Sequence, residues 1–352
     1  MRTGEFNEYL HPSAWTAAEL AGRSDWITYL TPDDVSELEN ALAHIKKRGI
    51  SIPHISRDDF PLPTFSGKLD TVRQALEDGV GIALIRGLPV DRYTKADAAA
   101  IYWGIGSHIG RACAQNAQGD MLGHVRDLGA DLRSDMRARG YQTRNNLPFH
   151  GDATDIVGLL CLRKSKSGGA SRIVSASKLY NVFAATRPDL CRLMAEPFYA
   201  DRRGEEVDGR KPYYVRPCFS FQNGRLYVWH TRTYIESAQR FPEVPRLTAQ
   251  QYEALDYLQS LCNDPQYCFE MDFEPGDMQF LCNYTVFHSR TEYEDWPEPE
   301  RKRHLLRLWL RTPFFSDLPQ AFEDRNADML AWQRSPRAPI FDTSEIASQL
   351  EH

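Results

Sequence analysis

The sequence has no long hydrophobic run. None of its apolar stretches approaches the roughly 20 residues that a membrane-spanning helix requires. Residues 1–6 also lack the apolar core of a secretory signal. We therefore expect a soluble protein of the cytoplasm that has no membrane partner.

Cysteine pairs at metal-binding or redox spacing are missing as well. The chain has seven cysteines, an odd number, and no two of them form a Cys-x-x-Cys motif. We therefore expect reduced thiols, with neither a disulfide framework nor a zinc ribbon.

Basic residues are not in excess. The chain has 42 Lys and Arg against 48 Asp and Glu, which gives a formal net charge of −6. A sequence-independent hold on nucleic acid or on an anionic membrane needs a basic face, so neither is expected as a partner. A small-molecule substrate fits better. The 352 residues, 42% of them hydrophobic, can form one large domain, and a homo-oligomer is left open.

Among the residues that are present, the pair His150-Gly-Asp152 has the strongest chemical meaning. On an extended backbone residues i and i+2 point the same way, so the pair can offer a nitrogen and an oxygen to one metal ion. His288 can supply a third ligand from a distant strand. Two histidines and one carboxylate are typical of non-haem Fe(II) oxygenases, although zinc accepts the same set.

The sequence around these residues is typical of strands. A short apolar run over 155–163 and a second one over 171–176 are separated by a Gly-containing turn. Residues 269–273 and 278–282 are two further strand patterns, interrupted by Pro275-Gly-Asp277. His288 therefore follows a predicted strand closely, which would give it rigid support.

Residues 303–311 are predicted to form a strand with two different faces. Arg303, Arg307 and Arg311 share one face with Leu305 and Trp309, while the alternate positions are mostly leucine. Because guanidinium groups bind carboxylates in a bidentate manner, this face suits an acidic ligand.

In this order, the motifs resemble the taurine dioxygenase-like (TauD/TfdA) branch of the Fe(II)/2-oxoglutarate-dependent oxygenases. The similarity covers residues 80–312 and implies an α+β, mainly β fold: a double-stranded β-helix (jelly-roll, cupin-like) core with flanking helices. The residues that carry the resemblance are His150-Gly-Asp152, the turn Gly168-Gly-Ala-Ser171, Pro275-Gly276-Asp277, His288, and Arg303 with Arg307.

The resemblance also implies roles for individual residues. His150, Asp152 and His288 would ligate iron. Arg303, assisted by Ser171, would bind the distal carboxylate of the cosubstrate 2-oxoglutarate, with Arg307 as the competing candidate. The implied reaction uses O2, releases succinate and CO2, and oxidises a C–H bond; hydroxylation is favoured, and desaturation or ring closure is left open.

Substrate contacts are predicted from nearness in the sequence and from charge. Arg307 favours an acidic or amino-acid-like small molecule, such as a biosynthetic intermediate. Nearness to the ligand pair makes five other polar residues candidates for substrate contacts: Asn116, Gln118, Asn145, Asn146 and Asp155.

Two rival functions share parts of this pattern. A zinc-dependent hydrolase could use the same two histidines and aspartate, but it would not need the downstream arginines. A catalytically silent jelly-roll protein could bind an acid through Arg303 or Arg307 without holding iron.

The rest of the chain predicts helices around this core within a single domain of residues 1–352. Helices are expected over 32–48, 69–78, 95–105, 178–195 and 252–262, and Asn223-Gly224 predicts a two-residue hairpin turn. Residues 1–65 are expected to form a peripheral helical segment, and residues 313–352 a tail.

Overall fold

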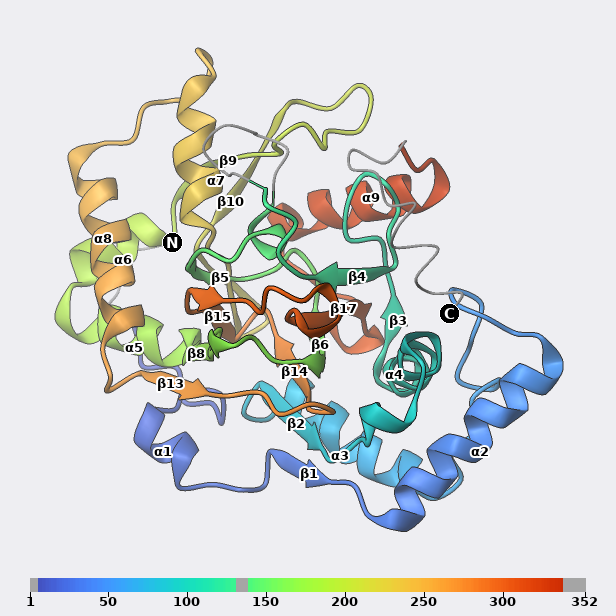
Figure 1. The fold of residues 1–352 in the computed structure, drawn as a ribbon. Coiled ribbons are helices and arrows are strands. Elements are labelled where there is room, and N and C mark those ends of the chain that lie inside the picture. The colour runs from blue at the N-terminus through green and yellow to red at the C-terminus, as the bar shows by residue number, and fades with distance from the viewer. Residues whose placement is uncertain (1–5, 131–138, 338–352) are drawn as a thin grey trace.

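Two β-sheets lie at the centre of the computed structural model, with helices packed on their outer faces (Figure 1). The structure describes residues 6–130 and 139–337. This arrangement confirms the predicted jelly-roll core with flanking helices. Within the described ranges, no helix is both long enough and apolar enough to cross a bilayer.

The larger sheet has seven strands in the order β1-β2-β14-β6-β17-β3, and β4 also pairs with β17. The β1–β2 pair is parallel, and the other pairs are antiparallel. Its strands are β1 (Ile27–Tyr29), β2 (Ile82–Arg86), β3 (Arg111–Ala112), β4 (Leu122–Val125), β6 (Ile156–Arg163), β14 (Met278–Cys282) and β17 (His304–Arg311).

The smaller sheet has four antiparallel strands in the order β13-β8-β15-β5. These are β13 (Cys268–Met271), β8 (Ser171–Ser175), β15 (Val286–Arg290) and β5 (Leu147–His150). Three two-stranded pairs lie outside the two sheets: β7 (Ser167–Gly168) with β16 (Tyr293–Glu294), β9 (Pro197–Asp201) with β10 (Tyr213–Pro217), and β11 (Phe219–Gln222) with β12 (Arg225–Val228).

Strand β17 shows how the sequence alternation becomes layered packing. Leu306, Leu308 and Leu310 join the apolar cluster beneath the helices of the larger sheet. Leu305 and Trp309 belong to other clusters, on the side of the smaller sheet. The odd-numbered positions of β17 therefore face the space between the sheets, as the period of two predicts.

Helices cover both sheets and bury the outer apolar faces. The capping box of Thr31 and Asp34 begins the longest one, which ends where Gly49 adopts a φ of 66°. Against the larger sheet lie α2 (Pro32–Arg48), α3 (Phe65–Glu77) and α4 (Lys95–Ile109); beside the smaller sheet lie α5 (Ala176–Thr186), α6 (Pro188–Met194) and α8 (Ala249–Asn263).

The structure corrects three expectations. The single helix predicted over 178–195 is two helices, because Pro188 begins a new one at α6. The amino-terminal segment is more than peripheral, since β1 joins the larger sheet and Trp26 is buried. The predicted tail contains α9 (Gln320–Arg334), whose Phe322 and Trp332 are buried. Two short helices, α1 (Ala17–Ala21) and α7 (Arg232–Ser237), complete the set labelled α.

Candidate active site

Two neighbouring strands of the smaller sheet carry the predicted metal ligands. Strands β5 and β15 run antiparallel, and His150 is paired with His288 across them. The centroids of the two rings are 4.3 Å apart. Asp152 follows at the end of β5, where its backbone N–H donates to Asn283 Oδ1 over 2.9 Å. The fold thus brings together three residues that are separated by up to 138 positions (288 − 150) in the sequence.

The three side chains offer donor atoms to one common point. One ligand atom from each of His150, Asp152 and His288 lies within 4.8 Å of the others. His150 Nε2 is 3.8 Å from Asp152 Oδ1, and His288 Nε2 is 3.9 Å from Asp152 Oδ2. The Nδ1 atom of His150 is 2.9 Å from the Pro148 carbonyl, so an N–H there would donate to it and leave Nε2 free for a metal. This donor set fits a non-haem iron.

The surroundings keep the donor set in the form that binds metal. Burial lowers the pKa of His288 to about 3, so its ring is neutral at physiological pH. Burial raises the pKa of the Asp152 carboxyl, but Arg307 and both histidines outweigh burial and hold the pKa below its usual value, so the carboxyl is ionised. Trp309 Nε1 donates to Asp152 Oδ2 over 2.9 Å and fixes its orientation.

A small inner cavity lies against the two histidines. It is lined by His150, His288, Ser171, Arg290 and Arg303, among others. Arg303 is 5% exposed, and its Nη1 has no hydrogen-bond partner. Arg290 is buried too, and its Nε and Nη1 are likewise unpartnered. Within the described residues neither guanidinium forms an ion pair, so this cavity fits an anion such as the distal carboxylate of 2-oxoglutarate.

A larger outer cavity opens on the other side of the ligands. His150, Asp152 and Trp309 line its inner end, together with Arg307, which borders both cavities. Arg307 Nε donates to Gln115 Oε1 over 2.7 Å, and its Nη1 lies 3.8 Å from Asp152 Oδ2. The guanidinium also lies 4.5 Å from the centroid of the Tyr141 ring. These contacts place a cation where a substrate would approach the metal.

The structure separates the other predicted contacts into two groups. Asn116 lines the outer cavity, although its amide also bonds to Asp120 and to the backbone of its own turn. Ser171 lines the inner cavity and donates to Gln279.

The remaining candidates are not among the lining residues. Gln118 lies in the turn after Asn116, and Asn145 and Asn146 are exposed beside β5. Asp155 is fully buried and holds the end of β17 instead: it accepts from Tyr284 and Thr312 and pairs with Arg311 at 3.1 Å. Nearness in the sequence was a poor guide for Asp155, because it lies directly before β6 and its side chain is taken up by these contacts.

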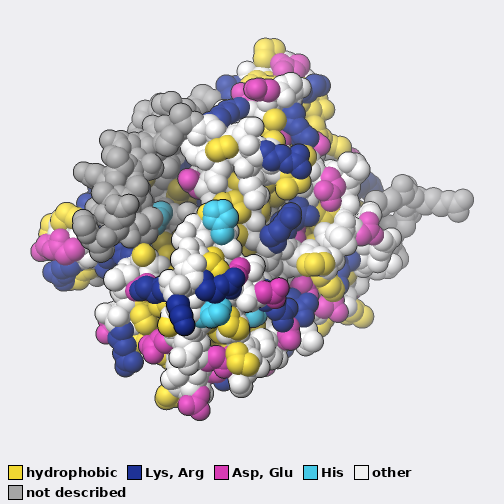
Figure 2. Space-filling view, turned by 90° about the vertical axis from the view of Figure 1, so that its right-hand side faces the viewer, with side chains coloured by type: hydrophobic (Ala, Val, Ile, Leu, Met, Phe, Trp, Pro, Cys, Tyr) yellow, Lys and Arg dark blue, Asp and Glu magenta, His cyan; other side chains and the backbone are white. Residues whose placement is uncertain are grey.

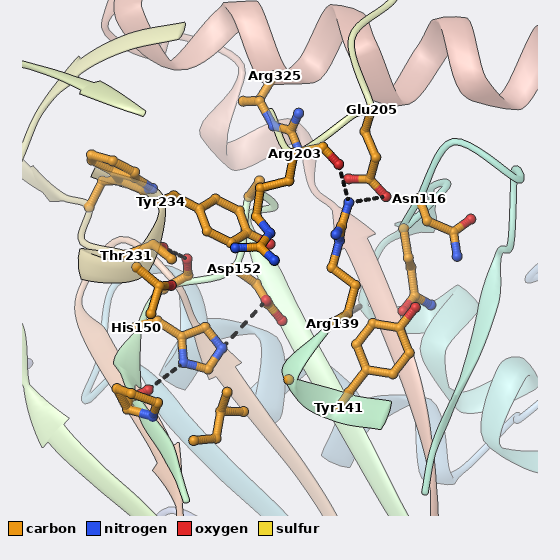
Figure 3. A pocket seen from close by; sticks show the side chains of 18 of the residues that line it. Asn116, Arg139, Tyr141, His150, Asp152, Arg203, Glu205, Thr231, Tyr234 and Arg325 are labelled. Carbon is orange, nitrogen blue, oxygen red and sulfur yellow. Dashed lines mark hydrogen bonds and ion pairs between the residues drawn. The ribbon is translucent and has the colours of Figure 1, made fainter. Parts of the chain in front are cut away.

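Several cavity residues were missed by the sequence reasoning. Most of them come from segments far in sequence from the metal ligands, and the local sequence around them has no special pattern. Figure 3 shows them around the outer cavity: Arg139, Tyr141, Arg203, Glu205, Thr231, Tyr234 and Arg325.

Comparisons with known proteins agree with this geometry. Residues 48–309 match the family described as "Taurine catabolism dioxygenase TauD, TfdA family". FR-33289 synthase of Streptomyces rubellomurinus (strain ATCC 31215) is 32% identical over 327 residues, which cover 91% of this chain and 95% of that protein. Uridine-5'-phosphate dioxygenase of an Amycolatopsis species is 27% identical over 209 residues, or 54% of this chain and 72% of that protein.

Solved structures share the fold. An asparagine oxygenase in complex with Fe(II), hydroxyasparagine and succinate has a TM-score of 0.64 at 17% identity, covering 82% of this chain and 94% of its own. The non-heme iron oxygenase OrfP, in complex with Fe and α-ketoglutaric acid, also has a TM-score of 0.64 at 17% identity, covering 89% and 99%. By its sequence match, its fold and its His–Asp–His site, the chain belongs to the TauD/TfdA family of Fe(II)- and 2-oxoglutarate-dependent dioxygenases.

Proposed function

We propose that the protein oxidises a C–H bond of a small anionic molecule, using an iron ion held by His150, Asp152 and His288. The observation that carries this proposal is the position of the inner cavity. It lies against both histidines and contains two buried arginines without an acidic partner in the described chain. A dicarboxylic cosubstrate that binds the metal at one end would supply the missing negative charge at the other.

Of the two candidate arginines, Arg303 is the better placed for the distal carboxylate of 2-oxoglutarate. Of these two cavities Arg303 lines the inner one, whereas Arg307 borders both and is already bonded to Gln115. Arg290 stands beside Arg303: both guanidinium groups lie over the Tyr293 ring, 4.8 and 5.1 Å from its centroid. We infer that the two arginines bind this carboxylate together, with Ser171 bordering the same space.

The chain's own residues position the reactants and exclude water. Bound iron with 2-oxoglutarate and O2 supplies the oxidising power and leaves succinate and CO2 as products. Arg307 would hold an anionic group of the substrate near the metal, and the Tyr141 and Trp309 rings beside it limit access of water. Hydroxylation is the outcome we propose, and desaturation or ring closure would use the same site.

The substrate class follows from the positive charge at Arg307. The names of two similar proteins agree with an anionic substrate, since one is an asparagine oxygenase and another a uridine-5'-phosphate dioxygenase. An amino acid has a carboxylate, and a nucleotide has a phosphate. For this chain we therefore propose an acidic metabolite.

Anaerobic titration tests the centre directly. Fe(II) added to the protein with 2-oxoglutarate should produce the weak visible charge-transfer band of the chelate, and the His288→Ala variant should not produce it. Under air, the wild-type protein should release succinate from 2-oxoglutarate. Absence of both signals would overturn the proposal, and hydrolysis of a substrate with zinc alone would favour the rival hydrolase.

A further inference from the structure

The outer cavity is also lined by arginines from three separate segments, and we call the part of the cavity between them its outer end. Arg139 precedes the short 3-10 helix Gly140–Gln142, Arg203 lies in the connection between β9 and β10, and Arg325 lies on α9. Figure 3 shows Arg203 reaching down beside Tyr234 toward Asp152, with Arg139 across from it and Arg325 above. Glu205 lies among them, 3.1 Å from Arg139.

The wall behind Arg325 has more positive than negative charge. Arg202 and Arg325 are 3% and 4% exposed, and both pair with the fully buried Asp328. Arg210 lies 3.3 Å from the same carboxylate. Burial, together with Arg325 and Arg210, lowers the pKa of Arg202 to about 10. Arg210 also lies 3.8 Å from the exposed Asp324, so two acids face these three cations and positive charge remains in excess at this wall.

Arg216 adds another buried cation to that wall. It is 3% exposed, and its hydrogen bonds go to the carbonyl groups of Ala321 and Phe322 rather than to an acid. Burial lowers the pKa of Arg216 to about 10, and Arg325 contributes to the shift. Burying like charges together is costly, so a positive wall around a cavity favours a ligand of opposite charge.

The backbone that presents Arg203 is held in an unusual conformation. Arg203 has a φ of 52°, in the left-handed region that non-glycine residues rarely adopt. Its N–H donates to the buried Asp201 carboxylate over 2.7 Å, and Ser237 and Arg240 donate to the same carboxylate. Such strain persists only when its surroundings fix it. Here it directs the guanidinium into the cavity.

We propose that this outer end binds a multiply charged tetrahedral oxyanion of the substrate, a phosphate ester or a phosphonate. A single carboxylate can be held by one guanidinium fork, and Arg307 offers one beside the metal ligands. A dianion with three oxygens can use several forks that converge from different directions, as Arg139, Arg203 and Arg325 do. This inference rests on the proposed function and specifies its substrate class.

Binding of small anions to the Fe(II)–2-oxoglutarate protein under anaerobic conditions tests the inference. The probes are ethylphosphonate, methyl phosphate, ethanesulfonate and propionate, which have similar sizes but different charges. Calorimetry at a pH where the first two are doubly ionised should give dissociation constants at least about tenfold lower for the dianions, a difference of about 1.4 kcal/mol. The two dianions distinguish a phosphonate-selective site from one that accepts either group.

Substitutions of single arginines test whether the dianion binds at the outer end. Arg203→Gln should weaken ethylphosphonate binding about tenfold and leave propionate binding as it was. Arg325→Lys, which keeps the charge but removes the fork, serves as a second variant in case one of them fails to fold. The matched control is Arg210→Gln, because Arg210 touches the same Asp328 but does not line the cavity.

Each outcome of these binding experiments supports or overturns the proposed oxyanion site. Similar affinities for all four anions would overturn the inference, and so would an equal loss of ethylphosphonate affinity in Arg203→Gln and Arg210→Gln. If the charge-transfer band forms but the dianions have no advantage, only the inference fails. If the band itself is absent, the proposed function fails.

Discussion

At the scale of single residues, the indole of Trp309 has a clear positioning role. Trp309 lies on β17 of the larger sheet, and its N–H donates to one oxygen of the Asp152 carboxylate over 2.9 Å. Hydrogen bonds to a ligating group fix its orientation, and their loss commonly costs 10-fold to 100-fold in metal affinity. The sequence placed Trp309 on the correct face of its strand but could not identify its partner.

Trp309→Phe should therefore weaken Fe(II) binding by about tenfold or more. The measurement is an anaerobic Fe(II) titration at saturating 2-oxoglutarate, followed by the charge-transfer band. Trp103→Phe is a suitable control, because it removes a similar indole hydrogen bond, to the Ile55 carbonyl over 2.9 Å, away from the site. Equal Fe(II) affinities in the wild type and Trp309→Phe would contradict the role.

The two inner arginines give a second prediction at this scale. Arg303→Gln and Arg290→Gln should each raise the KM for 2-oxoglutarate, Arg303→Gln by about 30-fold or more, since breaking a buried charge pair costs roughly 2 kcal/mol or above. The assay is succinate release in the absence of substrate. Arg301→Gln, which removes an exposed arginine two residues away, should have no effect. A larger KM effect in Arg307→Gln would reverse the assignment of the two residues.

At the scale of elements, the loop between β13 and β14 joins the sheets through a tight contact. Gly276 has a φ of 89°, and a Cβ there would overlap the Leu88 carbonyl oxygen. The next residue, Asp277, is buried and accepts two hydrogen bonds from Arg86 at the end of β2. The Pro-Gly-Asp motif thus fixes where β14 enters the larger sheet.

Gly276→Ala should lower the free energy of unfolding by more than Gly224→Ala does. Both residues have positive φ, but a Cβ at Gly224 would meet nothing within 4 Å. The control should therefore cost only the strain of the left-handed conformation, about 1 kcal/mol, whereas Gly276→Ala adds a backbone collision and should cost several. Denaturant unfolding of the two variants provides the comparison, and equal losses would argue against the collision.

A buried histidine pair connects β4 to β17. His124 Nδ1 and His304 Nε2 are 2.9 Å apart. Burial lowers the pKa of His124 from 6.5 to about 4 and that of His304 to about 2. Arg126 and Lys95 contribute to both shifts, His124 and Arg163 contribute to the shift at His304, and Asp120 opposes the shift at His124.

Stability should consequently fall as the pH drops from 6.5 toward 4. In that window the unfolded chain takes up protons at these histidines and the folded chain does not, so protons favour unfolding. His124→Gln should make the fall in denaturation midpoint shallower than in the wild type, while the exposed His54→Gln should not. Parallel curves for all three proteins would show that the pair does not contribute.

At the scale of the whole molecule, overall charge and local charge differ. The net charge is −6, and Figure 2 shows basic and acidic side chains mixed over one face of the molecule. The two cavities nevertheless collect arginines. Composition therefore favoured a small-molecule partner over a polyanionic polymer, but it could not reveal the arginines that line the cavities.

The sequence predicted those parts of the molecule that depend on local pattern. Strand periodicity gave β6, β8, β14 and β17, and the i, i+2 spacing gave the His150 and Asp152 pair. The outer cavity depends on residues 139, 203 and 325, whose approach is a tertiary event without a local signature. Two features that we did not predict have a visible signal in the sequence. Pro188 marks the helix break, and the spacing of Phe322, Met329 and Trp332 indicates a packed helix in the expected tail.

The arginines of the outer end stand on connections and on α9, whereas the metal ligands stand on or directly beside paired strands. Because of this division, the outer arginines can be substituted during evolution without disturbing the metal ligands. A descendant of this protein could change the molecules it accepts by altering a few positions at the rim, while its oxidising centre stays untouched in the scaffold beneath.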